Sequence, residues 1–186
     1  MQVENSPIVV GDKNKAAPWY SIEVQISSEA RKMLEEYAGV LPEEVKDHVL
    51  TMDVFPYPCI SKFHFLDLNL SLQPGYPQIM AKLQNADARH LKIACCVGQD
   101  LRKLVQDGVD SAKIVAVKLE KGYINAGYKL FCDRETLKTR FINADMLDDG
   151  IAELNQLEGT FDTSHLGLCL YVWNREEQMV VLRRVI

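Results

Sequence analysis

Beyond residue 89, short apolar runs alternate with segments in which apolar residues recur at helical spacing. The apolar runs predict four buried strands, at 90–96, 113–119, 140–143 and within 161–172. The amphipathic segments predict four helices, at 99–106, 123–131, 148–157 and 174–185. Asn174 predicts the cap of the last helix, because its side chain can accept backbone N–H groups there. Strands that alternate with helices are typical of a doubly wound α/β fold with a mostly parallel sheet.

The first 88 residues follow a different pattern. Helices are predicted at 28–38, where Gly39 ends the helix, from Pro42 onward, and at 76–84. The segment 53–65 is rich in aromatic residues and proline, which indicates an ordered loop. We therefore divide the chain into three parts. They are a flexible arm at 1–18, an N-terminal helical or lid region at 19–88, and an α/β core at 89–186.

Composition narrows the class of protein. A chain of 186 residues is long enough for one domain with a sizeable core. The net charge of −5 argues against nucleic-acid binding, and the apolar runs are too short for a membrane span. Residues 1–12 lack the pattern of a secretory signal, and the five cysteines are odd in number, which favours reduced thiols and a cytoplasmic location. No spacing of Cys and His predicts a metal site.

The strongest local signal is the run Leu91-Lys92-Ile93-Ala94-Cys95-Cys96-Val97-Gly98-Gln99-Asp100-Leu101-Arg102-Lys103-Leu104. An apolar strand leads into a turn of small residues, and the turn opens a helix. In α/β folds, this arrangement presents backbone N–H groups to a nucleotide-like ligand.

Four segments together extend this signal: Phe55-Pro56-Tyr57-Pro58-Cys59-Ile60, the turn and helix just described, Arg140-Phe141-Ile142-Asn143-Ala144-Asp145, and Phe161-Asp162 leading to Trp173. In this order they resemble class I S-adenosylmethionine-dependent methyltransferases, in particular those of fungal secondary-metabolite and meroterpenoid pathways. The resemblance runs from about residue 19 to the end of the chain. It implies a Rossmann-like fold and methyl transfer to an oxygen of a small metabolite.

The resemblance also assigns roles to residues. Those expected to bind the cofactor are Cys95, Gly98, Gln99, Asp100 and Asp145, with Glu120 as a possible substitute for the ribose-binding acid. Three positions depart from the family's pattern. Lys92 and Lys118 stand where the first and second strands end in acids, and Ala94 replaces a glycine.

The two lysines oppose this cofactor physically. An ammonium repels the ammonium of S-adenosylmethionine and cannot accept hydrogen bonds from the ribose diol. We therefore expect weakened cofactor binding. Because a buried lysine needs a partner, we also expect Lys92 and Lys118 to pair internally, with Asp100, Glu120 or Asp145 as candidates.

Two residues after the fourth strand are candidates for chemistry. His165 is a candidate general base, with a structural, hydrogen-bonded histidine as an equal alternative. Tyr171 is a candidate for lining the substrate pocket, with core packing as its alternative.

Three functions stay open from the sequence. The first is methyl transfer with a weakened cofactor site. The second is a non-methylating cyclase or isomerase acting on a pathway intermediate, and the third is a pseudoenzyme that only binds. The resemblance further implies strands beyond the fourth helix, so the predicted sheet lacks its last strands. We expect a second copy or a partner subunit to cover the open edge.

Overall fold

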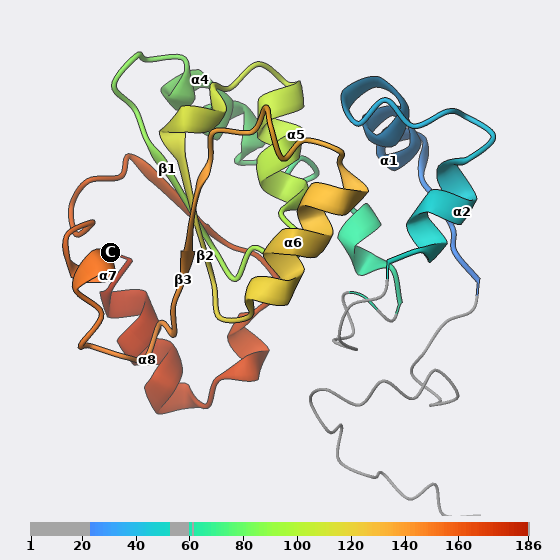
Figure 1. Ribbon diagram of the computed structural model, residues 1–186. Helices are drawn as coiled ribbons and strands as arrows, with labels where there is room; N and C mark the ends of the chain where they lie inside the picture. Colours follow the sequence, from blue (N-terminus) through green and yellow to red (C-terminus); the bar gives the residue numbers. More distant parts are fainter. Residues whose placement is uncertain (1–22, 53–59, 61, 186) are drawn as a thin grey trace, which may run out of the picture.

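The computed structural model describes residues 23–52, 60 and 62–185 (Figure 1). The predicted arm at 1–18 and most of the aromatic segment 53–65 lie outside the described residues. Among the residues that are described, no helix combines the length and apolar character needed to cross a membrane.

The predicted α/β sheet is confirmed. Four parallel strands form it, namely β1 (His90–Ile93), β2 (Ile114–Lys118), β3 (Arg140–Asn143) and β4 (Thr163–Leu166). Their spatial order is β3-β2-β1-β4. β2 and β3 follow β1 on one side, and β4 pairs with β1 on the other side, so the strand order switches between β1 and β4. This strand order is that of a doubly wound, Rossmann-like sheet, the fold that the resemblance implies. β4 lies at one edge, and its covering by a second copy or a partner subunit stays a prediction.

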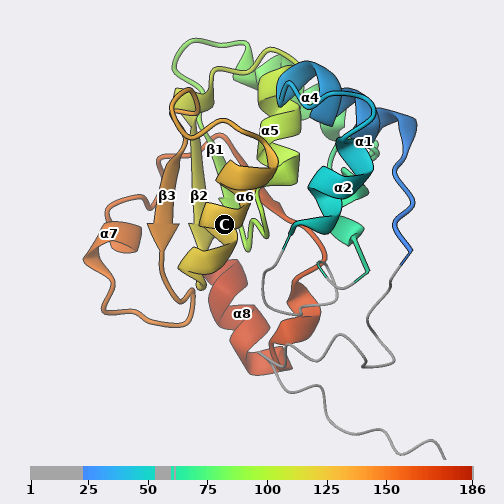
Figure 2. The same cartoon turned by 45° about the vertical axis from the view of Figure 1, so that its right-hand side comes forward.

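Helices cover both faces of the sheet (Figures 1 and 2). One layer contains α4 (Tyr76–Leu83), α5 (Gln99–Gln106) and α6 (Lys121–Leu130), and the other contains α7 (Ala152–Asn155) and α8 (Arg175–Arg183). Side chains of β2 alternate between the cores on the two faces of the sheet. Ile114 and Ala116 pack with α5, whereas Val115 and Val117 belong to the core on the α8 side. Asn174 caps α8 through a capping box with Glu177, as predicted.

The N-terminal helices form an outer layer against α6 rather than against the sheet (Figure 2). They are α1 (Ser28–Lys32), the π-helical turn η1 (Met33–Tyr37) and α2 (Val45–Leu50). Their buried apolar residues share one core with Cys96 and Val97 of the turn and with Tyr123 and Leu130 of α6. The N-terminal region therefore packs directly on the segment that follows β1.

Several predicted boundaries were wrong for local reasons. The first strand ends at Ile93 rather than at 96, because Ala94 and Cys96 adopt the left-handed conformation, with φ of 50° and 51°. The helix predicted at 148–157 shortens to α7, since the Asp148 side chain accepts the Gly150 N–H and forms a turn instead. The fourth strand lies within 161–172 as predicted, but it includes His165, which was expected after the strand.

Candidate functional site

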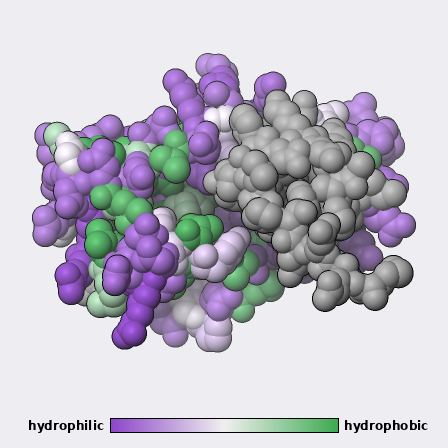
Figure 3. All heavy atoms as spheres, turned by 90° about the horizontal axis from the view of Figure 1, so that it is seen from below, coloured by the Kyte–Doolittle hydropathy of each residue, from purple (hydrophilic) through white to green (hydrophobic). Residues whose placement is uncertain are grey.

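A pocket of about 1070 Å³, counting its open mouth, lies where the strands end. Its walls come from the ends of β1, β2 and β3, the N-terminus of α5, the segment after β4, and His64 and Asn69 from the N-terminal region. Seen from the lower side of the molecule, hydrophobic side chains gather around a hollow (Figure 3). A pocket at the carboxyl ends of strands, beside the switch in strand order, is the usual ligand site of such sheets.

The turn between β1 and α5 forms one wall. Ala94, Cys96 and Gly98 all have positive φ, and Gly98 lacks space for a side chain because a Cβ atom there would lie 2.5 Å from Arg102 Nη1. Backbones of this kind form concave anion-binding sites in many proteins, and in this turn the Cys95 and Gly98 N–H groups already donate to the Val117 and Cys95 carbonyls. The left-handed conformation of Ala94 costs about 1 kcal/mol, which a glycine would avoid.

Lys92 is buried in the floor of this pocket. Its side chain is 2% exposed, and its ammonium lies 3.9 Å from Asp100 Oδ2, whose side chain is 4% exposed. In the described part of the chain, the ammonium makes one hydrogen bond, to the Ile93 carbonyl at 3.3 Å. Of the three predicted partners, Asp100 is the one that the structure places beside Lys92.

Lys118 lies on the opposite wall, at the end of β2. Its ammonium sits over the ring of Tyr123, 4.5 Å from the ring centroid, which stabilises the cation. Both lysines that replace acids of the family pattern therefore line the same pocket.

Gln99 and two carboxylates complete the polar lining. The Gln99 side chain is almost fully buried, and its Oε1 has no hydrogen-bond partner among the described residues. Asp100 accepts the Leu70 N–H at 3.1 Å, and Asp145 accepts the Leu147 N–H at 2.9 Å. This buried acceptor is therefore available to a hydrogen-bond donor in the pocket.

His165 lies beside Lys92 on the neighbouring strand but is not among the residues that line the pocket. Burial, and then the charge of Lys92, lower the pKa of His165 to about 3. Burial also lowers the pKa of His90 to about 3, with His165 and Lys92 adding to the effect. Both imidazoles are therefore neutral near pH 7, and His165 is a weak base.

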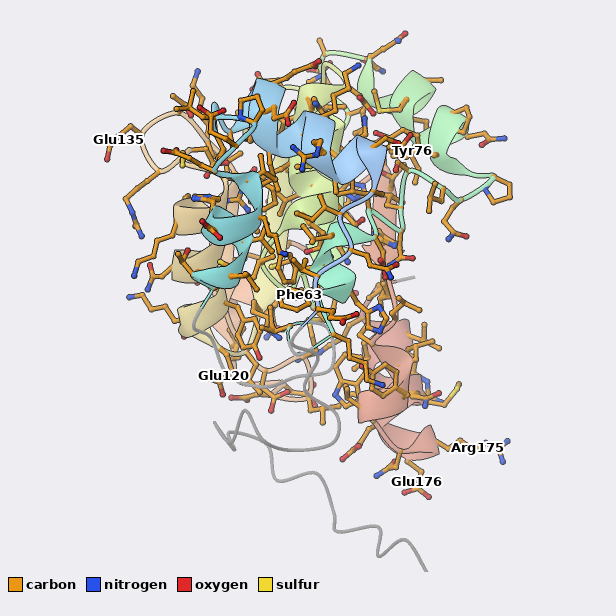
Figure 4. All side chains as sticks on the ribbon, turned by 90° about the vertical axis from the view of Figure 1, so that its right-hand side faces the viewer. Phe63, Tyr76, Glu120, Glu135, Arg175 and Glu176 are labelled. Atoms are coloured by element: carbon orange, nitrogen blue, oxygen red, sulfur yellow. The ribbon has the colours of Figure 1, made fainter. Side chains whose placement is uncertain are left out.

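The other predicted residues divide between pocket and periphery. Tyr171 lines the pocket mouth and is 68% exposed. Glu120 is exposed and outside the lining, and Figure 4 shows it at the periphery, so it does not face the pocket as a substitute acid. Cys95 is buried, and burial raises the pKa of its thiol, which suits a packing role. Gly98 is not among the residues that line the pocket, and it contributes the left-handed backbone that the turn requires.

Sequence reasoning missed several residues that line the site, and two of them are informative. Asn69 and Gly167 both line the pocket, although neither stands in a motif. A Cβ atom at Gly167 would lie 2.7 Å from His165 Nε2 and 3.6 Å from Lys92 Nζ, so a larger residue would not fit over the lysine. Their positions depend on how distant segments meet, and no local pattern signals them.

Comparison with known proteins agrees with this arrangement. Residues 19–66 match the family model of the meroterpenoid methyltransferase N-terminal domain. The O-methyltransferase phiE from a fungal strain (ATCC 74256) is 36% identical over 98% of this chain and 66% of its own length. The chain belongs to the fungal secondary-metabolite methyltransferase family. The O-methyltransferase atr3 of Stereocaulon alpinum is 37% identical over 92% of this chain and 51% of its own length.

A third member of the methyltransferase family widens the comparison. The Asnovolin E/Chermesin D methyltransferase nvfJ of Aspergillus novofumigatus is 34% identical over 87% of this chain and 60% of its own length. The chain thus spans about half to two thirds of the length of these relatives. Within the described ranges, no group of three or more His, Cys, Asp or Glu side chains is placed to hold a metal ion.

The family implies S-adenosylmethionine, and most of the pocket fits this cofactor. The unpartnered Gln99 Oε1 suits a hydroxyl or ammonium donor, and Asp145 suits an amino group of the adenine. The apolar wall of Val117, Leu119 and Met146 suits the adenosyl rings. Lys92 and Lys118 are unfavourable, because each replaces an acceptor with a cation. The pocket therefore combines groups that suit the cofactor with two cations that do not.

Proposed function

We propose that this chain binds S-adenosylmethionine weakly and takes part in methyl transfer to an oxygen of a small metabolite. The observation that carries the proposal is the pocket at the strand ends, where the turn, Gln99 and Asp145 meet. The oxygen acceptor follows from phiE and atr3, which are named O-methyltransferases. When bound, S-adenosylmethionine supplies the activated methyl group.

The chain's own residues would then position the reactants. Gln99 would accept a hydrogen bond from the cofactor, and Asp145 would accept one from the amino group of the adenine. Tyr171 and Trp173 line the mouth of the pocket and would bound the space for an apolar metabolite. Methyl transfer to an oxygen depends mainly on alignment of the two reactants, which these walls supply.

The reduced affinity follows from the two lysines. A hydrogen bond to a charged group contributes about 1.5–3 kcal/mol, and each replaced acid removes one such acceptor. The loss of two bonds weakens binding on the order of 100- to 10,000-fold. Repulsion between Lys92 and a ligand ammonium adds to this loss.

Calorimetric titration tests the proposal. S-adenosylmethionine and S-adenosylhomocysteine are titrated into the protein and into the double variant Lys92→Asp/Lys118→Asp. We expect weak binding by the natural sequence and at least about 100-fold tighter binding by the double variant. The control, Lys129→Asp/Lys138→Asp, changes the net charge equally at exposed residues outside the pocket and should leave the affinity unchanged. The absence of binding by both pocket forms would overturn the proposal.

A second candidate is a protein of this family that binds a metabolite without methylating it. The burial of the Lys92 ammonium favours it, since a buried cation at this position opposes the family's cofactor. A pseudoenzyme or a cyclase or isomerase would share this property. Metabolite binding that persists when S-adenosylmethionine fails to bind either form would support this candidate.

A further inference from the structure

Arg102 is fully buried beneath the turn that forms one wall of the pocket. Its Nη1 donates to the Val97 carbonyl at 2.8 Å and to the Gly98 carbonyl at 3.3 Å. Its Nε and Nη2 donate to the two carboxylate oxygens of Asp133, at 2.6 and 2.9 Å. One guanidinium thus joins the turn to the loop after α6 through a bidentate pair, the geometry that arginine suits best.

The N-terminal region reaches the same carboxylate. The Tyr37 hydroxyl, in η1, donates to Asp133 Oδ2 at 2.8 Å. The Tyr37 ring meets Phe131 edge to face, with centroids 6.4 Å apart, and the Arg102 guanidinium stacks 4.8 Å from the Phe131 centroid. Burial, and then the charge of Asp133, raise the pKa of Tyr37, so its hydroxyl keeps the proton that it donates.

The turn needs support of this kind. Ala94 and Cys96 hold an unfavourable left-handed backbone, and such a backbone persists when its surroundings over-determine it. Behind the turn, a Cβ atom at Gly127 of α6 would lie 2.1 Å from the Val97 carbonyl oxygen. The turn is therefore in contact with Arg102, α6 and the N-terminal core.

We propose that Tyr37, Asp133 and Arg102 form a positioning unit through which the N-terminal helices hold the turn 94–98 in its ligand-binding shape. Arg102 touches the backbone of the turn and not the pocket, so it is a positioning residue. The N-terminal region then sets the affinity of the pocket from behind it. This inference goes beyond the proposed function, because it concerns the turn whatever ligand the pocket takes.

Two matched tyrosine variants test the unit. Tyr37→Phe removes the hydroxyl that reaches Asp133. Tyr76→Phe removes an equivalent hydroxyl, which donates to Asp107 Oδ2 at 2.6 Å at the far end of α5. Figure 4 shows Tyr76 near the top of the molecule, away from the end where Glu120 lies. Each variant loses one tyrosine–carboxylate hydrogen bond, so their melting temperatures should fall similarly.

Amide hydrogen exchange distinguishes the two variants. We expect residues 94–98 to exchange about fivefold faster in Tyr37→Phe, with β2 and β3 unchanged, and no change of the turn in Tyr76→Phe. Unchanged exchange of the turn in Tyr37→Phe, or equal changes in both variants, would overturn the proposal. This readout needs no ligand, so it stands even if S-adenosylmethionine does not bind.

Affinity provides the second readout, which a purely structural role would not move. In the Lys92→Asp/Lys118→Asp background, Tyr37→Phe should weaken S-adenosylmethionine binding about fivefold, whereas Tyr76→Phe should leave it unchanged. Equal affinities in the two tyrosine variants would count against the unit. If the background itself does not bind, the proposed function fails and the exchange measurement alone decides the inference.

Discussion

The ammonium of Lys92 lies 3.9 Å from Asp100 Oδ2 in the floor of the pocket, with both side chains almost completely buried. The two residues are not equivalent. Asp100 also accepts the Leu70 N–H and lies in the first turn of α5, where the helix dipole favours a negative charge. Among the residues that the structure describes, Lys92 has one further hydrogen bond, to the Ile93 carbonyl. Asp100 is therefore the better-supported member of the pair.

This asymmetry predicts unequal costs for removing either member. Asp100→Ala leaves a buried ammonium without its ion-pair partner and the Leu70 N–H without an acceptor, and should lower the free energy of unfolding by about 3–5 kcal/mol. Lys92→Met keeps the length of the side chain and leaves Asp100 a buried carboxylate that still accepts the Leu70 N–H, so the cost should be smaller, about 1–3 kcal/mol. Urea unfolding measures both. A larger loss in Lys92→Met than in Asp100→Ala would contradict the asymmetry.

Replacing Ala94 by glycine should stabilise the protein. Its φ of 50° is unfavourable for a residue with a Cβ atom, and the glycine that replaces it removes this strain. We expect a gain of about 1 kcal/mol in thermal or urea unfolding. Ala88→Gly is the control, since Ala88 is buried without a positive φ and should lose stability. Parallel losses in both variants would show that the turn carries no strain.

Gly127→Ala should damage the turn through α6. The added methyl group would lie 2.1 Å from the Val97 carbonyl oxygen, so either the helix or the turn must move. We expect a loss of about 1–3 kcal/mol and faster amide exchange at 94–98. Gly75→Ala is the matched control, because its φ is −80° and nothing lies within 4 Å of the added Cβ position. A fully stable Gly127→Ala variant would refute the close packing of α6 on the turn.

The free energy of unfolding should fall as the pH drops from 6.5 to 5.5. His90 and His165 have folded-state pKa values of about 3, well below the value of about 6.5 in an unfolded chain. Below pH 6.5 the unfolded chain therefore binds more protons than the folded one, which favours unfolding. Each histidine contributes up to about 1 kcal/mol between pH 6.5 and 5.5, with a smaller share from the partly exposed His165.

Urea unfolding at pH 6.5 and at pH 5.5 tests this dependence. His90→Gln should flatten it by up to about 1 kcal/mol, because Gln does not titrate. Ala88→Gly supplies the control, because it changes a buried site without removing a titrating group and should keep the full dependence. The same pH dependence in His90→Gln as in the natural sequence would show that the buried imidazole is not the cause.

The order and kind of the elements in the α/β core followed from the sequence alone. Apolar runs and helical spacing are local patterns, and burial of those apolar faces imposes a parallel sheet with helices on both sides. The cap at Asn174 and the left-handed Gly39 were equally predictable, since each depends on neighbours within a few residues. The resemblance likewise placed Gln99, Asp100 and Asp145 at one pocket, because parallel strand ends meet at one edge.

The tertiary structure alone decided how the charges of the site are partnered. Lys92 pairs with Asp100, whereas Glu120 is exposed and lies outside the pocket lining. Lys92 and His165 are neighbours because β1 and β4, distant along the chain, pair in one register. Tyr37 meets Asp133 across 96 residues. Such contacts depend on how whole elements pack, because hydrogen bonds and close ion pairs form between atoms only a few ångströms apart. The local sequence pattern around each residue therefore does not predict them.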